Sequence, residues 1–138
     1  MKTLIRFVFV TSLLITIGPA RAQDAEQLAW LVKGTPDPAA IEAHDGAGSF
    51  IFATGEGIAI WHSRDRTSWK RIGRVVEDAV PKWASRLIPK ADSVWAPDIQ
   101  FHNGRYYLYY SVSTFGIQRS VIGLATNTTL NPKSPHYH

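Results

Sequence analysis

The chain has 138 residues, of which 45% are hydrophobic, 12% aromatic and 19% charged, and it contains no cysteine. This composition excludes an intrinsically disordered chain and a small scaffold held together by disulfides. The formal net charge of +4 overstates the basic character, because three of the fifteen basic residues and none of the eleven acidic ones lie within residues 1–22. Residues 23–138 therefore contain twelve basic and eleven acidic residues, and this near-neutral balance gives no support to a nucleic-acid partner.

The first 22 residues have the pattern of a secretory signal. Lys2 and Arg6 precede an apolar run at 7–18, and Ala20-Arg21-Ala22 is a small-x-small cleavage site. The apolar run is too short to span a bilayer, which needs about 20 residues. We therefore predict a signal peptide at 1–22, a secreted or periplasmic protein, and no membrane contact after cleavage.

Short runs rich in β-branched and aromatic residues alternate with turn residues in the first half of the mature chain. They predict four strands, at 38–43, 49–54, 58–63 and 69–76. Residues 79–90 contain two prolines, and we predict an excursion loop there with no helix.

The second half repeats this scheme. Residues 98–102 lead into Asn103-Gly104, which is a strong hairpin signal, and strands are predicted at 106–113 and 121–126. The aromatic residues alternate along 106–113, so we expect one face in the core and the other packed against a neighbouring sheet. Residues 131–138 are predicted to form a loop.

Corresponding points of the two halves lie roughly 60 residues apart, since a Pro-Asp pair recurs at Asp37 and Asp98 and a strand recurs at Ile58 and Val121. A period of this length, built from four short strands, predicts the blade of a β-propeller. A β-sandwich has similar strand spacing but does not predict a recurring Pro-Asp at the head of each unit. The predicted fold class is all-β, with one blade and about three-quarters of a second.

Each Pro-Asp places a carboxylate at the entrance of a unit. Asp37 stands between Pro36 and Pro38, so its backbone is stiff. At the head of an innermost strand its side chain would point into the central channel, where it could act as a general base. Asp98 has the same local position one blade later. For both residues the alternative is a turn carboxylate that caps backbone N–H groups.

Trp95 and Phe115 are candidate sugar platforms, because the C–H face of a sugar ring packs on an aromatic plane. Phe115 precedes Gly116, where the missing side chain would let a substrate approach the backbone closely. The alternative for both aromatic residues is a place in the core. The five histidines show no ligand spacing, so no metal site is predicted within this chain.

Several segments resemble the glycoside hydrolases of family 43, and the resemblance runs over roughly residues 35–138. The segments that carry it are Asp37-Pro38, Phe52-Ala53-Thr54-Gly55 and Trp95-Ala96-Pro97-Asp98-Ile99, while 106–116 and 122–127 are similar to endo-1,5-α-L-arabinanases in particular. The resemblance implies a five-bladed propeller whose first two blades would be residues 23–138. It also implies an enzyme that hydrolyses the α-1,5 bonds of arabinan with inversion and acts as a monomer on arabinan or arabino-oligosaccharides.

The same resemblance implies roles for individual residues. Asp37 matches the catalytic base, Trp95 and Phe115 match aromatic residues that line the arabinose cleft, and Gly116 matches a glycine that contacts substrate. Asp98 matches a motif acid of the family, to which no catalytic role is carried over. The general-acid glutamate, the carboxylate that tunes its pKa, and any calcium-like ion are expected from residues beyond His138.

Two features depart from the family pattern. The residue before the catalytic Asp is usually His, whereas here it is Pro36. In addition, no glutamate in the chain matches the general acid, since Glu42, Glu56 and Glu77 all fall in the first blade. We therefore expect the 138-residue chain to be inactive by itself.

Three alternatives stay open at this point. The first is an exo-acting arabinofuranosidase or β-xylosidase of the same family, and the second is a propeller that binds carbohydrate without cleaving it. The third is a truncated reading frame without function.

Overall fold

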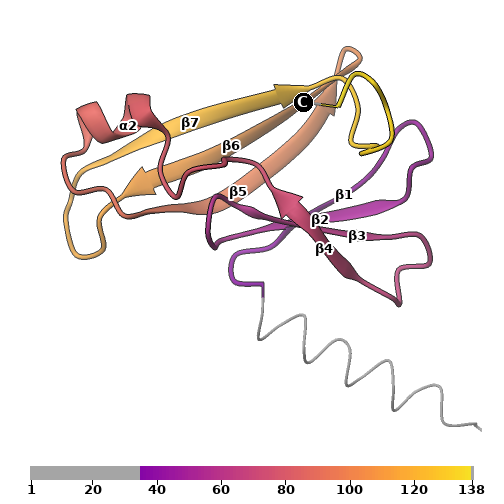
Figure 1. The fold of residues 1–138 in the computed structure, drawn as a ribbon, viewed down its shortest axis with the longest axis horizontal. Coiled ribbons are helices and arrows are strands. Elements are labelled where there is room, and N and C mark those ends of the chain that lie inside the picture. Colours follow the sequence, from indigo (N-terminus) through magenta and orange to yellow (C-terminus); the bar gives the residue numbers. More distant parts are fainter. Residues whose placement is uncertain (1–34, 138) are drawn as a thin grey trace, which may run out of the picture.

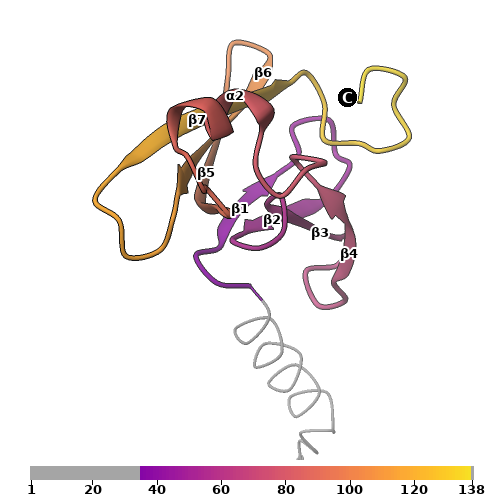
Figure 2. The ribbon, with the colours of Figure 1, turned by 60° about the vertical axis from the view of Figure 1, so that its left-hand side comes forward.

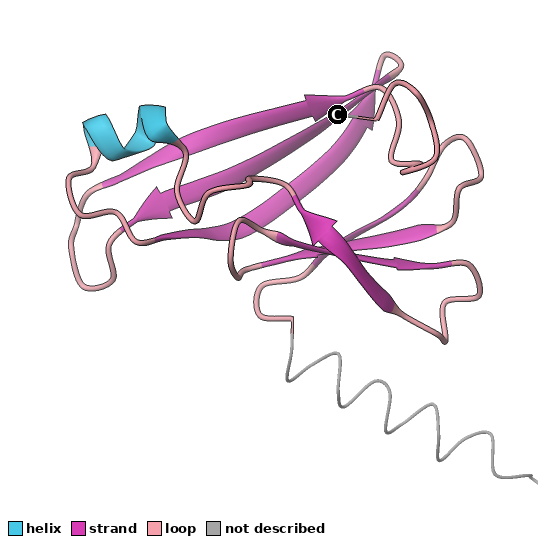
Figure 3. Ribbon diagram, in the orientation of Figure 1, coloured by secondary structure: helices cyan, strands magenta, loops and turns pink. Residues whose placement is uncertain are grey.

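The computed structural model describes residues 35–137, so the predicted signal peptide lies outside the described residues. Strands dominate this part of the chain, and one short helix accompanies them (Figures 1 and 3). In chain order the elements are β1 Ala39–Glu42, β2 Ser49–Ala53, β3 Ala59–Ser63, β4 Lys70–Arg74, α2 Lys82–Leu87, β5 Ser93–His102, β6 Arg105–Ser113 and β7 Ser120–Asn127.

The first sheet is an antiparallel meander in the order β1-β2-β3-β4. The two central strands are almost wholly buried, whereas β4 is exposed along its length. A polar turn joins β3 to β4, and within it the Asp65 Oδ1 atom accepts hydrogen bonds from the backbone N–H groups of Thr67 (2.9 Å) and Ser68 (2.7 Å). These bonds hold the pKa of the Asp65 carboxyl well below its usual value. The four strands predicted for the first half are confirmed.

The second sheet has the order β5-β6-β7 and is also antiparallel. Asn103 and Gly104 both have positive φ, 47° and 76°, as a two-residue hairpin of the favoured hand requires. Tyr106, Leu108 and Tyr110 are buried and alternate with more exposed neighbours, which confirms the predicted alternation.

The start of β5 differs from the prediction. We expected a strand from residue 98 after a proline-stiffened turn, but the strand begins at Ser93 and contains a bulge between Trp95 and Asp98. A bulge leaves residues out of the hydrogen-bond ladder, so Pro97, which has no N–H to donate, is tolerated there.

The helix α2 contradicts the prediction of an uninterrupted loop over 79–90. Pro81 directly precedes the first helical residue, where a missing N–H costs nothing, and Pro89 comes after the last one. Ala84 is fully buried in the core and anchors the helix. Two prolines that seemed to forbid a helix therefore bracket one.

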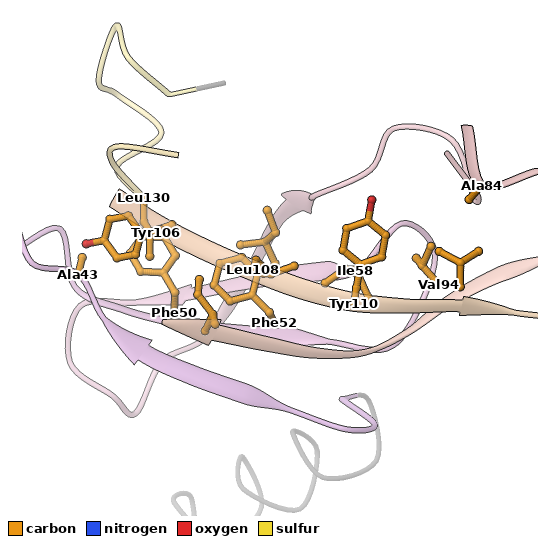
Figure 4. Close-up of a cluster of buried hydrophobic side chains, with 13 residues drawn as sticks. Ala43, Phe50, Phe52, Ile58, Ala84, Val94, Tyr106, Leu108, Tyr110 and Leu130 are labelled. Atoms are coloured by element: carbon orange, nitrogen blue, oxygen red, sulfur yellow. The ribbon is translucent and has the colours of Figure 1, made fainter. Parts of the chain in front are cut away.

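The hydrophobic core lies between the two sheets, with β5 against β1 and β2 (Figure 2). Figure 4 shows Phe50 and Phe52 from β2 gathered with Tyr106 and Leu108 from β6. Burying an aromatic or large aliphatic side chain contributes about 1.5–3 kcal/mol, so this interface dominates the stability of the pair of sheets.

Polar contacts tie the sheets together at the turn between β1 and β2. The backbone N–H of His44 donates to the Tyr106 hydroxyl (2.7 Å), and the Thr129 hydroxyl donates to Asp45 Oδ2 (2.8 Å). Burial raises the pKa of Tyr106, so the phenol stays neutral and can accept this bond. Residues 131–137 contain no strand, as predicted.

Candidate functional site

Asp37 is separated from the start of β1 only by Pro38 and is exposed to solvent. Its φ of 49° is in the left-handed region, which is uncommon for a residue with a side chain. Within residues 35–137 the side chain does not cap a backbone N–H. Its Oδ2 atom accepts a hydrogen bond from the Thr54 hydroxyl at 2.7 Å.

Thr54 connects the end of β2 in the first sheet to the first part of β5 in the second sheet. It follows β2 directly, and its hydroxyl oxygen accepts a hydrogen bond from the backbone N–H of Ala96 at 2.8 Å. Its own N–H donates to the carbonyl of Pro36 at 2.9 Å. The next residue, Gly55, forms an antiparallel bridge with Val94. Asp37 is thereby placed beside the β5 bulge, although the two lie far apart in the sequence.

Trp95 and Phe115, the two candidate sugar platforms, lie next to each other in the structure. Their ring centroids lie 6.5 Å apart with planes tilted by 38°, within the range of interacting aromatic pairs. Phe115 is 86% exposed, so it lies outside the core of the described part of the chain, while Trp95 is half-buried. Thr114 steadies the Phe115 loop, because its hydroxyl donates to the carbonyl of Lys90 at 2.9 Å.

Gly116 continues this loop with a φ of 81°, a conformation that favours glycine. A Cβ atom built at Gly116 would meet no heavy atom within 4 Å, so the space beside its backbone is open. This is the environment expected of a residue that a ligand could approach closely.

Asp98 is exposed and pairs with Tyr109 across the sheet, beyond the bulge. Within residues 35–137 no hydrogen bond or ion pair engages its carboxylate, so it does not cap a turn in this part of the chain. The structure therefore joins Asp37 to the β5 bulge by hydrogen bonds but does not join Asp98 to Asp37.

A cavity in the described part of the chain lies elsewhere. It measures about 270 Å³ between the two sheets and is lined mainly by apolar side chains, including Phe50, Tyr106 and Leu130. None of the candidate site residues lines it. Over residues 35–137 no group of three or more His, Cys, Asp or Glu side chains could hold a metal ion.

Sequence reasoning did not single out Thr54 or Ala96. Thr54 stands inside one of the segments that resemble the family, but nothing in its spacing marks it as a partner of Asp37. Its role depends on contacts with residues 17 and 42 positions away. Only the packing of one sheet on the other reveals them.

Two antiparallel sheets that pack face to face, with consecutive innermost strands side by side, define part of a β-propeller. Residues 31–136 match the family described as Glycosyl hydrolases family 43. The chain belongs to this family.

Individual relatives agree with this assignment. An extracellular exo-α-(1→5)-L-arabinofuranosidase of Cellvibrio japonicus is 46% identical over 98 residues, covering 70% of this chain and 28% of that protein. An extracellular endo-α-(1→5)-L-arabinanase of Bacillus subtilis is 33% identical over 139 residues, covering 94% of this chain and 42% of that protein. The solved structure of Cellvibrio cellulosa α-L-arabinanase complexed with arabinohexaose is 45% identical with a TM-score of 0.68, and covers 75% of this chain and 32% of that one.

The chain thus spans between 28% and 42% of the length of these relatives. Its structural neighbours are arabinanases built as five-bladed β-propellers, and its two sheets correspond to part of that ring. The predicted fold class is therefore confirmed. No helix among the described residues is long and apolar enough to cross a membrane.

Proposed function

We propose that this chain belongs to an exported enzyme that hydrolyses the α-1,5-arabinofuranosidic bonds of arabinan, acting within the polymer and inverting the anomeric centre. The observation that carries the proposal is the arrangement at the heads of β1 and β5. There an exposed carboxylate, Asp37, is hydrogen-bonded through Thr54 to the bulge that follows an aromatic platform, Trp95 with Phe115. The names of the relatives support both the substrate and export from the cell.

In the proposed mechanism Asp37 is the general base. It would take a proton from the water that attacks the anomeric carbon, while a carboxylic acid on the opposite side protonates the departing glycosidic oxygen. The two carboxyl groups of an inverting enzyme stand about 6.5–9.5 Å apart, which leaves room for that water. Asp37 is suited to this task because it is exposed and its backbone is restricted by a proline on each side.

The general acid is proposed to come from outside residues 1–138. Within the described part, Glu42 forms an ion pair with Arg66 (2.7 Å), Glu56 lies 3.7 Å from Arg74, and Glu77 lines the cavity between the sheets. These positions give none of the three the role of facing Asp37 across a water. We also propose that any calcium or similar ion is bound outside this chain, and that the 138-residue chain by itself does not turn over arabinan.

The sugar platform is proposed to be formed by Trp95 and Phe115, with Gly116 leaving the backbone open to substrate. Phe115 supports this role most directly, because its ring is 86% exposed beside Trp95 and offers an apolar face on which a sugar ring could pack. For Asp98 we propose a place beside the cleft and no part in proton transfer.

A second candidate is exo-acting hydrolysis of the same bond. It is favoured by the 46% identity to a relative named as an exo-α-(1→5)-L-arabinofuranosidase. Endo and exo action differ in the loops that close one end of the cleft, so the sizes of the first products distinguish them. Random cleavage of linear arabinan releases mixed oligomers, whereas exo action releases one product from the start.

The decisive test is Asp37→Asn in the native gene product, with linear 1,5-α-arabinan as substrate. Asparagine keeps the size of the side chain but cannot take the proton, so turnover should fall by about 10²–10⁴-fold. Arabinohexaose should still bind, as measured by isothermal titration calorimetry. Asp78→Asn, at an exposed residue of the loop before α2, is the matched control and should keep wild-type turnover. Undiminished turnover in Asp37→Asn would exclude Asp37 as the base, and absence of turnover in the wild type would favour a propeller that only binds carbohydrate.

A further inference from the structure

The Thr54 hydroxyl lies between two groups that determine how its proton points. The backbone N–H of Ala96, 2.8 Å away, can only donate, so the Thr54 oxygen must accept from it. A hydroxyl has a single proton, and that proton is left for Asp37 Oδ2 at 2.7 Å. The direction of the bond is therefore set by chemistry: the Thr54 hydroxyl donates and the Asp37 carboxylate accepts.

Thr54 is itself held firmly. Its backbone N–H donates to the carbonyl of Pro36, directly before Asp37, and its neighbour Gly55 is bridged to Val94 in β5. A β-branched side chain has few χ1 rotamers, so a fixed backbone also fixes the position of the hydroxyl.

The two groups that Thr54 joins have unfavourable backbone conformations. Asp37 has a φ of 49° and Ala96 a φ of 46°, and both residues precede a proline. Left-handed conformations are costly for residues other than glycine, and they persist where surrounding contacts hold them. The Thr54 hydroxyl provides such a contact to both at once.

We propose that Thr54 is a positioning residue for the catalytic base. It occupies Oδ2 of Asp37, which leaves Oδ1, unengaged by any hydrogen bond within residues 35–137, as the atom that takes the proton. It also sets the distance between the base and the sugar platform, because its other bond goes to the residue after Trp95. The inference rests on the proposed role of Asp37 and extends it by naming the group that orients the carboxylate.

The test compares Thr54→Val with Thr54→Ser in the native gene product on linear 1,5-α-arabinan. Valine keeps the branching and size of threonine but removes the hydroxyl, and small misplacements of a catalytic group cost up to about 10²-fold in rate. We expect kcat of Thr54→Val to fall about tenfold to hundredfold while KM changes by less than about threefold. Thr54→Ser should restore most of kcat, because serine supplies the same donor. Thr67→Val, at an exposed threonine of the β3–β4 turn, should leave both constants unchanged.

Three outcomes would overturn the inference without touching the proposed function, provided that Asp37→Asn is inactive. They are wild-type kcat in Thr54→Val, an equal loss in Thr54→Ser, and a change confined to KM. Thermal denaturation of each variant separates misfolding from misplacement. Thr54→Val should lose some stability because two hydrogen bonds are removed, but the inference requires a lower kcat in a variant that is still fully folded at the assay temperature. In the Asp37→Asn background, Thr54→Val should cause no further loss, because the two residues act as one unit. If Asp37→Asn itself is fully active, the proposed function fails first.

Discussion

Substitution of Gly57 tests how tightly the turn between β2 and β3 packs against the segment that follows β4. This glycine lies in the turn between β2 and β3, is buried, and has a φ of 67°. Its carbonyl accepts hydrogen bonds from the backbone N–H groups of Val75 (2.9 Å) and Val76 (2.8 Å). A Cβ at this position would overlap the carbonyl oxygen of Val76 and would lie 3.0 Å from the Arg74 Cδ atom. Gly57→Ala should therefore strain the backbone and force the two segments apart.

The expected loss of stability has two parts. Holding alanine in the left-handed conformation costs about 1–2 kcal/mol. Moving Val76 away from Gly57 weakens the two hydrogen bonds to the Gly57 carbonyl, each worth about 0.5–1.5 kcal/mol, so the whole change should be about 2–5 kcal/mol. Gly46→Ala is the matched control, because Gly46 has a similar φ of 72° but no heavy atom within 4 Å of the added Cβ. It should lose only the first part.

Urea denaturation of the native gene product, followed by tryptophan fluorescence, measures both changes. We expect Gly57→Ala to be less stable than Gly46→Ala by about 1–3 kcal/mol, the contribution of the overlap alone. Equal losses in the two variants would refute the reasoning, because the contact with Val76 would then have no energetic consequence. A change in the slope of the unfolding free energy against urea concentration would instead mean that the variant no longer unfolds in the same two-state transition, so that its free energy could not be compared with that of the control.

Two further predictions concern acid stability and the sugar platform. Hydrogen bonds from the backbone of Ser68 and Thr67 and from the Ser63 hydroxyl lower the pKa of Asp65, so its contribution to stability is complete above the unfolded pKa of about 4 and is lost as the pH falls below it. The urea midpoint between pH 6 and pH 2.5 should therefore fall less steeply in Asp65→Asn than in wild type, and parallel curves would contradict this. Phe115→Ala should weaken binding of arabinohexaose about fivefold to thirtyfold, measured by calorimetry, with little change in melting temperature because the ring is 86% exposed; an unchanged Kd would mean that Phe115 does not contribute to sugar binding.

Local signals in the sequence determined most of the fold. The strands of both sheets follow from runs of β-branched and aromatic residues, whose preference for the pleated backbone is local. Asn103-Gly104 specified its hairpin because few residues other than Asn and Gly tolerate two successive positive φ values. The roughly 60-residue period then indicated the propeller, since identical units must stack in the same way.

Other features were decided only when the sheets packed. The helix α2 is six residues long, too short to be stable alone, and it exists because Ala84 is buried in the core. The bulge after Trp95 likewise accommodates Pro97, which has no N–H to donate, in a strand that continues on both sides.

The residues of the candidate site could likewise be named from the sequence, whereas the contacts between them could not. Asp37, Trp95, Phe115 and Gly116 could be named from the sequence because their residue types and neighbours carry a chemical meaning by themselves. The link that joins them, from Asp37 through Thr54 to the β5 bulge, spans 17 and 42 positions of sequence. A threonine looks the same in sequence whether its hydroxyl faces water or a carboxylate, so only the tertiary structure could assign this one its partners.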